Sequence, residues 1–196
     1  MKRLLLIIIL TLSFQTLIRA DDIRDFQIEG MSIGDSLLDF YSKEEILDSP
    51  KANRYKDKTY TTATFFQINS DKLSTYESIT VSYKLNDNEY LIVGQGGVLG
   101  FKNNHSKCYK KKDTIVKEIK MLFPDNKVID LTKKISGSTD GSITKQSYIK
   151  LNNGFIGVQC KKFGKEFKKK YNEFDHLKVD MFNKKFNYWL INIAFK

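Results

Sequence analysis

Several stretches of the chain alternate hydrophobic and polar residues, the pattern of half-buried β-strands. The clearest covers residues 143–160, where two hydrophobic arms flank Asn153-Gly154, a dipeptide that favours tight hairpin turns. Further strands are predicted at residues 60–68, 76–85, 90–101 and 177–182, with a turn at Asn86-Asp87-Asn88. We therefore expect an antiparallel sheet built from β-hairpins.

Two other stretches space their hydrophobic residues as a helix does. Residues 108–123 predict an amphipathic helix that Pro124 ends. Residues 33–48 predict a broken helix begun by two capping patterns, Ser32-Ile-Gly-Asp35 and Ser42-Lys-Glu-Glu45. Residues 51–58 are interpreted as a loop, and residues 127–141 as a long polar connection apart from a short hydrophobic run at 128–131.

The C-terminal part allows two interpretations. Phe163, Phe167, Tyr171 and Phe174 follow a helical spacing, although Gly164 disfavours a helix there. Residues 184–195 fit either a helix capped by Asn183 or a final strand. Together the elements predict an α+β fold in which an antiparallel sheet of β-hairpins is covered by two or three helices.

The N-terminus has the features of a secretory signal peptide at residues 1–20: a basic start, a short hydrophobic run from residue 4 to 12, and a small residue, Ala20, at the expected cleavage point. We expect an exported protein, periplasmic or secreted, with no transmembrane segment after cleavage, because no second long hydrophobic run follows. Residues 21–196 suit one domain. Similar hairpin sequences at 82–90 and 147–155 suggest two related halves, 21–101 and 102–196, although coincidence explains the likeness equally well.

The charge is unevenly distributed. Residues 21–101 hold 8 basic and 14 acidic residues, net −6, whereas residues 102–196 hold 22 basic and 9 acidic residues, net +13. The basic part could attract phosphates, anionic lipid or acidic polymers. Beyond the signal peptide only Arg24 and Arg54 are arginines, and lysine lacks the bidentate geometry of arginine, so we do not expect nucleic acid as a partner.

Two cysteines in an exported chain most simply form a disulfide, here Cys108 with Cys160, which would close a loop of about 52 residues. Two alternatives remain open at this stage. Cys108 could be a reactive thiol at a helix N-terminus with His105 or His176 as its base. The two cysteines and two histidines could also hold zinc, although the second pair lacks metal-binding spacing.

The sequence carries no specific catalytic or cofactor motif. It contains no Gly-x-Ser-x-Gly elbow, and its two histidines leave few ways to build a Ser/His/Asp set. The glycine run at 94–100 half-resembles a dinucleotide-binding turn, but its spacing is different and no helix follows, so we interpret these glycines as permitting a bulge or close packing. We assign no catalytic, cofactor-binding or metal-binding residues, and we lean towards a non-enzymatic protein.

The sharpest functional hypothesis concerns residues 161–174. Lysines that surround a stripe of aromatic residues are typical of a helix lying on an anionic membrane surface. The simpler alternative is that the aromatic side chains face the core and the lysines face water. The candidate contact residues are Lys161, Lys162, Lys165, Lys168, Lys169 and Lys170.

Three phrases of the chain resemble a known group of proteins. They are residues 26–40, FQIEGMSIGDSLLDF, residues 108–115, CYKKKDTI, and residues 158–160, VQC. They are similar to sequences in a group of small, uncharacterised exported proteins from AT-rich marine bacteria, over most of the mature chain. The resemblance implies a periplasmic setting and paired cysteines, and the segment after Cys160 is more basic here than the group suggests.

These observations predict a periplasmic, non-enzymatic binding or envelope-associated protein whose partner is unknown. The alternative is a peripheral binder of an anionic membrane surface or acidic polymer through residues 161–174. A thiol or hydrolytic enzyme is the remotest reading. A surface binder should expose aromatic side chains beside lysines, whereas an enzyme should gather polar groups in a concave pocket.

Overall fold

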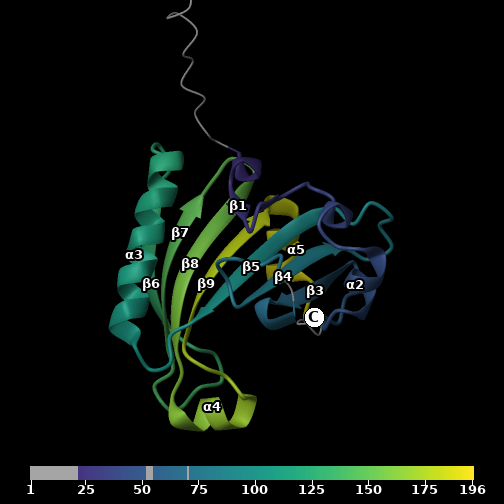
Figure 1. The fold of residues 1–196 in the computed structure, drawn as a ribbon. Helices are drawn as coiled ribbons and strands as arrows, with labels where there is room; N and C mark the ends of the chain where they lie inside the picture. The colour runs from purple at the N-terminus through teal and green to yellow at the C-terminus, as the bar shows by residue number, and fades with distance from the viewer. Residues whose placement is uncertain (1–21, 52–54, 70) are drawn as a thin grey trace, which may run out of the picture.

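The computed structural model describes residues 22–51, 55–69 and 71–196. Its main feature is a seven-stranded antiparallel sheet in the order β3-β4-β5-β9-β8-β7-β6 (Figure 1). The strands are β3 (Tyr60–Phe66), β4 (Ser78–Lys84), β5 (Ile92–Gly100), β6 (Val128–Lys134), β7 (Ile143–Lys150), β8 (Gly154–Lys162) and β9 (His176–Asn183). The α+β fold, the antiparallel sheet and the disulfide Cys108–Cys160 are as the sequence predicts.

The remaining elements lie around this sheet. They are η1 (Ile23–Asp25), a small hairpin of β1 (Gln27–Ile28) and β2 (Met31–Ser32), η2 (Leu37–Asp39), α2 (Lys43–Asp48), η3 (Gln67–Asn69), α3 (His105–Leu122), α4 (Lys165–Tyr171) and α5 (Lys184–Asn192). The predicted signal peptide falls outside the described residues. Strands from both parts of the chain share one sheet; that its halves are related remains a prediction.

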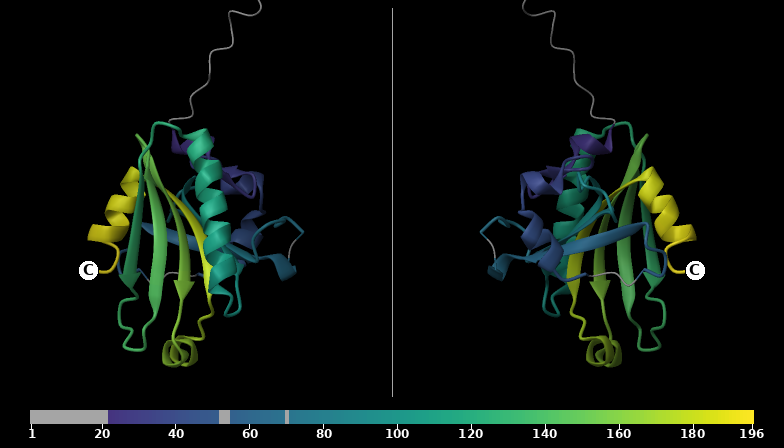
Figure 2. Two further views of the ribbon diagram at one scale, coloured as in Figure 1. Left: turned by 90° about the vertical axis from the view of Figure 1, so that its left-hand side faces the viewer. Right: turned by 90° about the vertical axis from the view of Figure 1, so that its right-hand side faces the viewer.

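The two faces of the sheet are covered differently. Helix α3 packs on β8 and β9 from one side and α5 packs on the same strands from the other, while α4 lies at one end of the molecule (Figure 2). Val158 of β8 sits opposite Val179 of β9 and is fully buried on the side of α3. The main core lies here and under the N-terminal segment, and a smaller aromatic cluster around Phe186 and Trp189 lies under α5.

The hairpin at residues 143–160 is confirmed, but for a different reason than its Asn-Gly pair suggested. Neither Asn153 nor Gly154 has a positive φ, and the turn closes with Leu151 N–H donating to the carbonyl of Gly154. A Cβ on Gly154 would lie 2.6 Å from the carbonyl oxygen of Phe182, so glycine is needed for close packing. The Asn153 side chain accepts from Ile23 N–H at 2.9 Å and ties the turn to the N-terminal segment.

The broken helix expected at residues 33–48 is only partly present. Gly34 has a φ of +96°, which interrupts any helix at the first capping pattern, and Asp35 instead accepts a hydrogen bond from Ser32 N–H. The second pattern is confirmed, because Ser42 and Glu45 form a reciprocal capping box at the start of α2. The expected helix is therefore reduced to the short η2 and α2.

Strand β6 was not predicted, because residues 127–141 were interpreted mainly as a polar connection. The strand lies at the edge of the sheet and pairs only with β7. All its residues except Val128 are exposed, so it has no buried face to impose alternation on the sequence. Its lysines, Lys133 and Lys134, are the charged residues that protect exposed sheet edges from further pairing.

Three other interpretations are resolved by the structure. Residues after Asn183 form a helix, and the Asn183 side chain caps α5 by accepting from Phe186 N–H at 2.7 Å. The register between β4 and β5 shifts between Ser82 and Tyr83, an irregularity of the kind that a β-bulge produces. A Cβ on Gly94 would lie 2.7 Å from the Phe182 ring, which supports the close packing expected of the glycines in β5.

Candidate functional site

The disulfide joins the first turn of α3 to the middle of the sheet. Cys108 and Cys160 are 2% and 3% exposed, and their Cα atoms are 6.1 Å apart. Bonded sulfurs are not available as thiolates, so this pair supplies neither a nucleophile nor zinc ligands. The thiol enzyme and the zinc site proposed from the sequence therefore lose their reactive groups.

The two histidines contact other partners. His105 Nε2 lies 3.7 Å from a carboxylate oxygen of Asp175. His176 is buried at the start of β9, and its Nδ1 lies 2.8 Å from the carbonyl oxygen of Phe174. Burial and, to a lesser extent, the positive charge of Lys161 together lower the pKa of His176 to about 4. Among the described residues, no three His, Cys, Asp or Glu side chains gather closely enough to hold a metal ion.

Helix α4 carries most of the lysines singled out from the sequence, and its start is held from a neighbouring loop. Asp140 accepts a hydrogen bond from Phe167 N–H at 2.9 Å and further bonds from Ser138 and Ser142. These donors hold the pKa of Asp140 well below its usual range. Ser142 also accepts from Gly164 N–H at 2.8 Å, and Gly164 is the extended N-cap residue of α4, so it begins the helix and does not weaken its interior.

A second carboxylate fixes α4 to the sheet. Asp175 accepts hydrogen bonds from Lys168 Nζ at 2.7 Å and from Phe163 N–H at 2.8 Å. Burial alone would raise the pKa of Asp175, but these two donors lower it below its ordinary value. Lys168 also donates to Asn103, so its charge serves to anchor the helix.

The aromatic stripe of residues 163–174 is divided between core and surface. Phe163 is buried, and its ring stacks on that of the half-buried Phe167 with centroids 5.3 Å apart. Tyr171 is 50% exposed and Phe174 is 46% exposed. The first half of the stripe thus follows the core interpretation and the second half follows the surface interpretation.

The six predicted contact lysines divide in the same way. Lys161 is half-buried on β8, and Lys168 forms an ion pair with Asp175. The other four are exposed on or beside α4: Lys162, Lys165, Lys169 and Lys170. We call the surface formed by these four lysines with Tyr171 and Phe174 the α4 end; it forms one extremity of the molecule (Figure 1).

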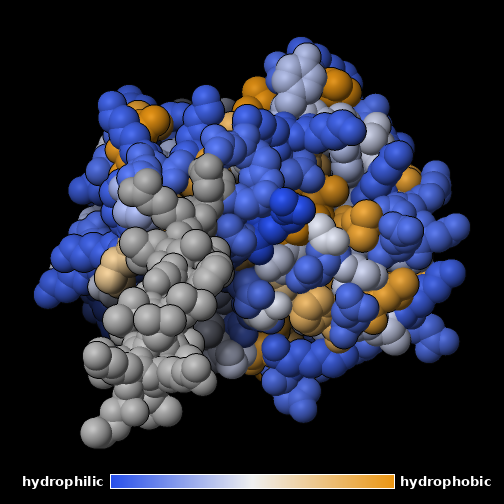
Figure 3. All heavy atoms as spheres, turned by 90° about the horizontal axis from the view of Figure 1, so that it is seen from above, coloured by the Kyte–Doolittle hydropathy of each residue, from blue (hydrophilic) through white to orange (hydrophobic). Residues whose placement is uncertain are grey.

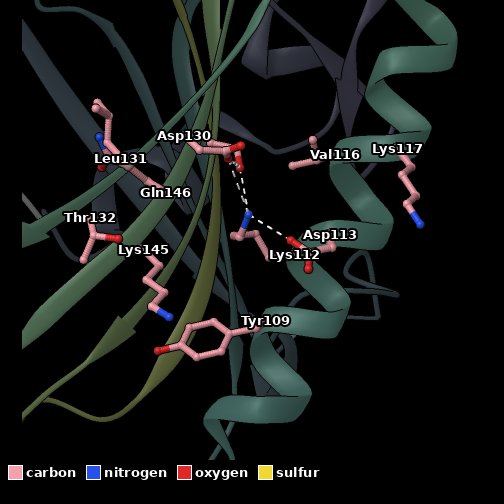
Figure 4. Close-up of a pocket in the computed structure, with 11 residues that line it drawn as sticks. Tyr109, Lys112, Asp113, Val116, Lys117, Asp130, Leu131, Thr132, Lys145 and Gln146 are labelled. Atoms are coloured by element: carbon pink, nitrogen blue, oxygen red, sulfur yellow. Dashed lines mark hydrogen bonds and ion pairs between the residues drawn. The ribbon is translucent and has the colours of Figure 1, made fainter.

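A cavity of about 620 Å³ lies between α3 and the strands β7 and β6, of which β6 is the edge strand (Figure 4). Lys112 reaches into it from α3 and donates to Ser147 Oγ at 2.8 Å, with Asp113 and Asp130 at 3.0 and 3.9 Å. Ser147 in turn donates to Asp130 at 2.5 Å. Lys145 lies over the ring of Tyr109 at the other side of the cavity.

This lysine and serine could suggest a hydrolytic pair, but their surroundings argue for an anchor. Ser147 is fully buried and its proton already goes to Asp130, so a substrate carbonyl has no approach to Oγ. Lys112 is satisfied by a serine and two carboxylates from both sides of the cavity. The cluster therefore holds α3 against the edge of the sheet.

Another polar cluster lies on the sheet face opposite α3, and no sequence pattern predicted it. Asp180 of β9 is 5% exposed and sits between Gly96 of β5 and Gly157 of β8. Its Oδ2 accepts from Gln159 at 2.5 Å, while Lys178 lies 2.6 Å from Oδ1 as an ion pair without good hydrogen-bond alignment. Only the strand register brings these residues together.

Lys161 extends this cluster along β8. Burial lowers the pKa of Lys161, and the positive charge of Lys178 lowers it further. Its side chain also lines a cavity of about 290 Å³ with Thr144, Gln146 and Glu173. Lys161 therefore faces the interior side of the α4 region and adds little to the exposed positive surface.

The opposite end of the molecule has a different surface. Seen from above, it is mostly hydrophilic, with hydrophobic side chains in several places among the hydrophilic ones (Figure 3). None of the helices formed by the described residues combines the length and hydrophobicity needed to cross a bilayer.

Comparisons with protein-family models, with curated proteins and with solved structures found no match for the chain.

Proposed function

We propose that this protein is a non-enzymatic, peripheral binder of anionic membrane surfaces that acts through the α4 end. The observation that carries the proposal is the exposure of Tyr171 and Phe174, 50% and 46%, beside four exposed lysines at one extremity. Aromatic rings favour the interfacial region of a bilayer, and lysines are attracted to anionic headgroups. Acidic polymers would engage the lysines but give the rings no apolar layer to enter.

The α4 end is also preorganised. Asp140 and Asp175 fix the start and the middle of α4 to the rest of the fold, so the exposed lysines and rings are held in place before binding. A rigid binding surface loses less conformational entropy on association than a flexible one. The short helix therefore acts as part of a folded surface.

The predicted export of the chain gives this surface a target. Disulfides persist in oxidising compartments, and the bond between Cys108 and Cys160 fits a protein that works outside the cytoplasm. In a periplasmic setting, the anionic leaflets of the envelope are the membranes that the α4 end would meet.

The experiment measures how much protein sediments with vesicles of phosphatidylcholine that contain roughly 30% phosphatidylglycerol. Vesicles of phosphatidylcholine alone serve as the comparison. The variant Lys165→Gln/Lys169→Gln/Lys170→Gln removes three exposed charges from the α4 end. At about 1 kcal/mol for each lysine near an anionic surface, we expect affinity to fall by roughly a hundredfold. The matched control, Lys43→Gln/Lys84→Gln/Lys185→Gln, removes three exposed charges elsewhere and should change it little.

Salt and the aromatic ring provide two further readouts. Binding should weaken as ionic strength rises, because salt screens exposed charges. Tyr171→Ala should weaken vesicle binding without changing binding to a soluble acidic polymer such as heparin. The proposal is wrong if the protein does not bind anionic vesicles at low salt, or if both triple variants lose affinity equally.

A further inference from the structure

A second, hydrophobic cavity begins beside the α4 end. It has a volume of about 590 Å³ and lies between β5 and the N-terminal turns of α3. Leu99, Phe101 and Phe174 line it, and Phe174 is also part of the α4 end. The cavity therefore borders the surface that we propose to face the membrane.

A second cavity lies further along the helix. This neighbouring cavity of about 240 Å³ shares Leu99 and Lys111 with the first and is lined further on by Ile115, Ile119 and Leu122. From Lys107 to Leu122, the helix axis covers about 22 Å at 1.5 Å per residue. We call the two cavities together the α3 trough. Two neighbouring cavities placed one after the other along a helix suit an extended hydrocarbon chain better than a compact ligand.

Positive charge is concentrated at the end of the trough near Phe174. Lys102, Lys107 and Lys111 line the first cavity and are exposed, and none of them forms an ion pair with another described residue. Glu77 is the one acidic side chain among the described residues that line this cavity, which leaves a net charge of +2. The second cavity contains Glu118, so an anionic headgroup would favour the end near Phe174.

We propose that the α3 trough binds a single-chain anionic amphiphile, such as a fatty acid. The acyl chain lies along α3 over Leu99 and Ile115, and the carboxylate meets Lys102, Lys107 and Lys111. This inference deepens the proposed membrane function, since the same end of the molecule would face both the bilayer and the ligand. A cationic amphiphile is disfavoured by the three lysines.

The test measures binding of dodecanoate, kept below its micellar concentration, by isothermal titration calorimetry and by changes in amide chemical shifts. We expect one saturable site, with shift changes at Leu99, Phe101 and the first turns of α3. Lys107→Glu/Lys111→Glu should weaken binding at least about tenfold, because hydrogen bonds to a charged group are among the strongest. The control Lys110→Glu/Lys117→Glu, on the same helix outside the α3 trough, should change it less than about fivefold.

Two variants separate this inference from the membrane proposal. Leu99→Trp fills the α3 trough and should abolish dodecanoate binding while leaving vesicle binding intact, with circular dichroism to confirm folding. Lys165→Gln/Lys169→Gln/Lys170→Gln should do the reverse. The inference is overturned if dodecanoate shows no saturable binding, if the shifts map elsewhere, if dodecyltrimethylammonium binds as tightly, or if both lysine-pair variants weaken binding equally.

Discussion

Removing the disulfide between Cys108 and Cys160 should destabilise the protein strongly without changing its fold. The bond closes a loop of 52 residues between α3 and β8. The chain-entropy relation gives about 14 cal/mol/K for such a loop, or about 4 kcal/mol at 25 °C. That is a large share of the 5–15 kcal/mol, roughly, that stabilises a typical domain.

The measurement is urea unfolding of the wild-type protein and of Cys108→Ala/Cys160→Ala, followed by fluorescence. The chain has one tryptophan, Trp189, which is 5% exposed and donates to Asp57, so its emission should report the loss of the native state. With an m-value near 2 kcal/mol/M, we expect the midpoint to fall by roughly 2 M. The far-ultraviolet spectrum should stay native, because α3 keeps its contacts through Ile115, Ile119 and Phe123.

Two results would refute this reasoning. If alkylation without a reductant labels both cysteines in the purified protein, the bond is absent and the calculation does not apply. If the bond is present but the variant loses less than about 1 kcal/mol, the unfolded chain is already compact enough that closing the loop adds little.

Three further changes have expected outcomes. Burial lowers the pKa of His176 to about 4, so the unfolded state binds a proton more readily than the folded state does. About 3 kcal/mol of stability should therefore be lost as pH falls from about 6.5 to 4. His176→Asn should flatten this pH dependence, measured as the urea midpoint at each pH. Gly154→Ala should lower the stability measured by thermal unfolding by about 1–3 kcal/mol, because the added Cβ would clash with the backbone of β9. In Gly157→Ala the nearest neighbour of the added Cβ lies at 4.0 Å, so the loss should be less than about 0.5 kcal/mol. Equal losses would contradict the packing argument. Asp175→Asn should lower the free energy of unfolding by about 2 kcal/mol, because it weakens the contact with Lys168. Amide hydrogen exchange in α4 should become faster. Unchanged exchange would show that Asp140 alone holds the helix.

The sheet could be predicted from the sequence wherever one face of a strand is buried. Strands β4, β8 and β9 alternate because their inward residues meet α3 and the N-terminal segment. Strand β6 has no buried face and carries no such pattern. The Asn153-Gly154 pair led to the correct hairpin, but the structure uses the glycine for close packing and the asparagine as a tie to Ile23. Such a role depends on contacts between distant residues.

The candidate site was predictable only in outline. The lysines and aromatic residues of 161–174 stand out in the sequence. How α4 docks determines that Lys168 forms an ion pair with Asp175 and that Lys161 points inward, and the sequence pattern does not show this. Of the lysines of the α3 trough, only Lys111 falls within the amphipathic helix predicted at residues 108–123. The cavity that Lys111 lines could not be predicted, because it is also lined by Leu99 and Phe174, two residues that lie far apart in the sequence.

Phe174 links the two proposals physically, because it is exposed at the α4 end and also lines the α3 trough. A bilayer that binds the α4 end would therefore lie beside the opening of the trough, where Lys102 and Lys107 are exposed. A single-chain amphiphile leaving the bilayer could then enter with its chain shielded from water over Leu99 and its headgroup still near lysines. Tyr171 belongs only to the surface and Leu99 only to the trough, so substitutions there can show whether binding to the membrane and binding of the amphiphile are coupled or merely adjacent.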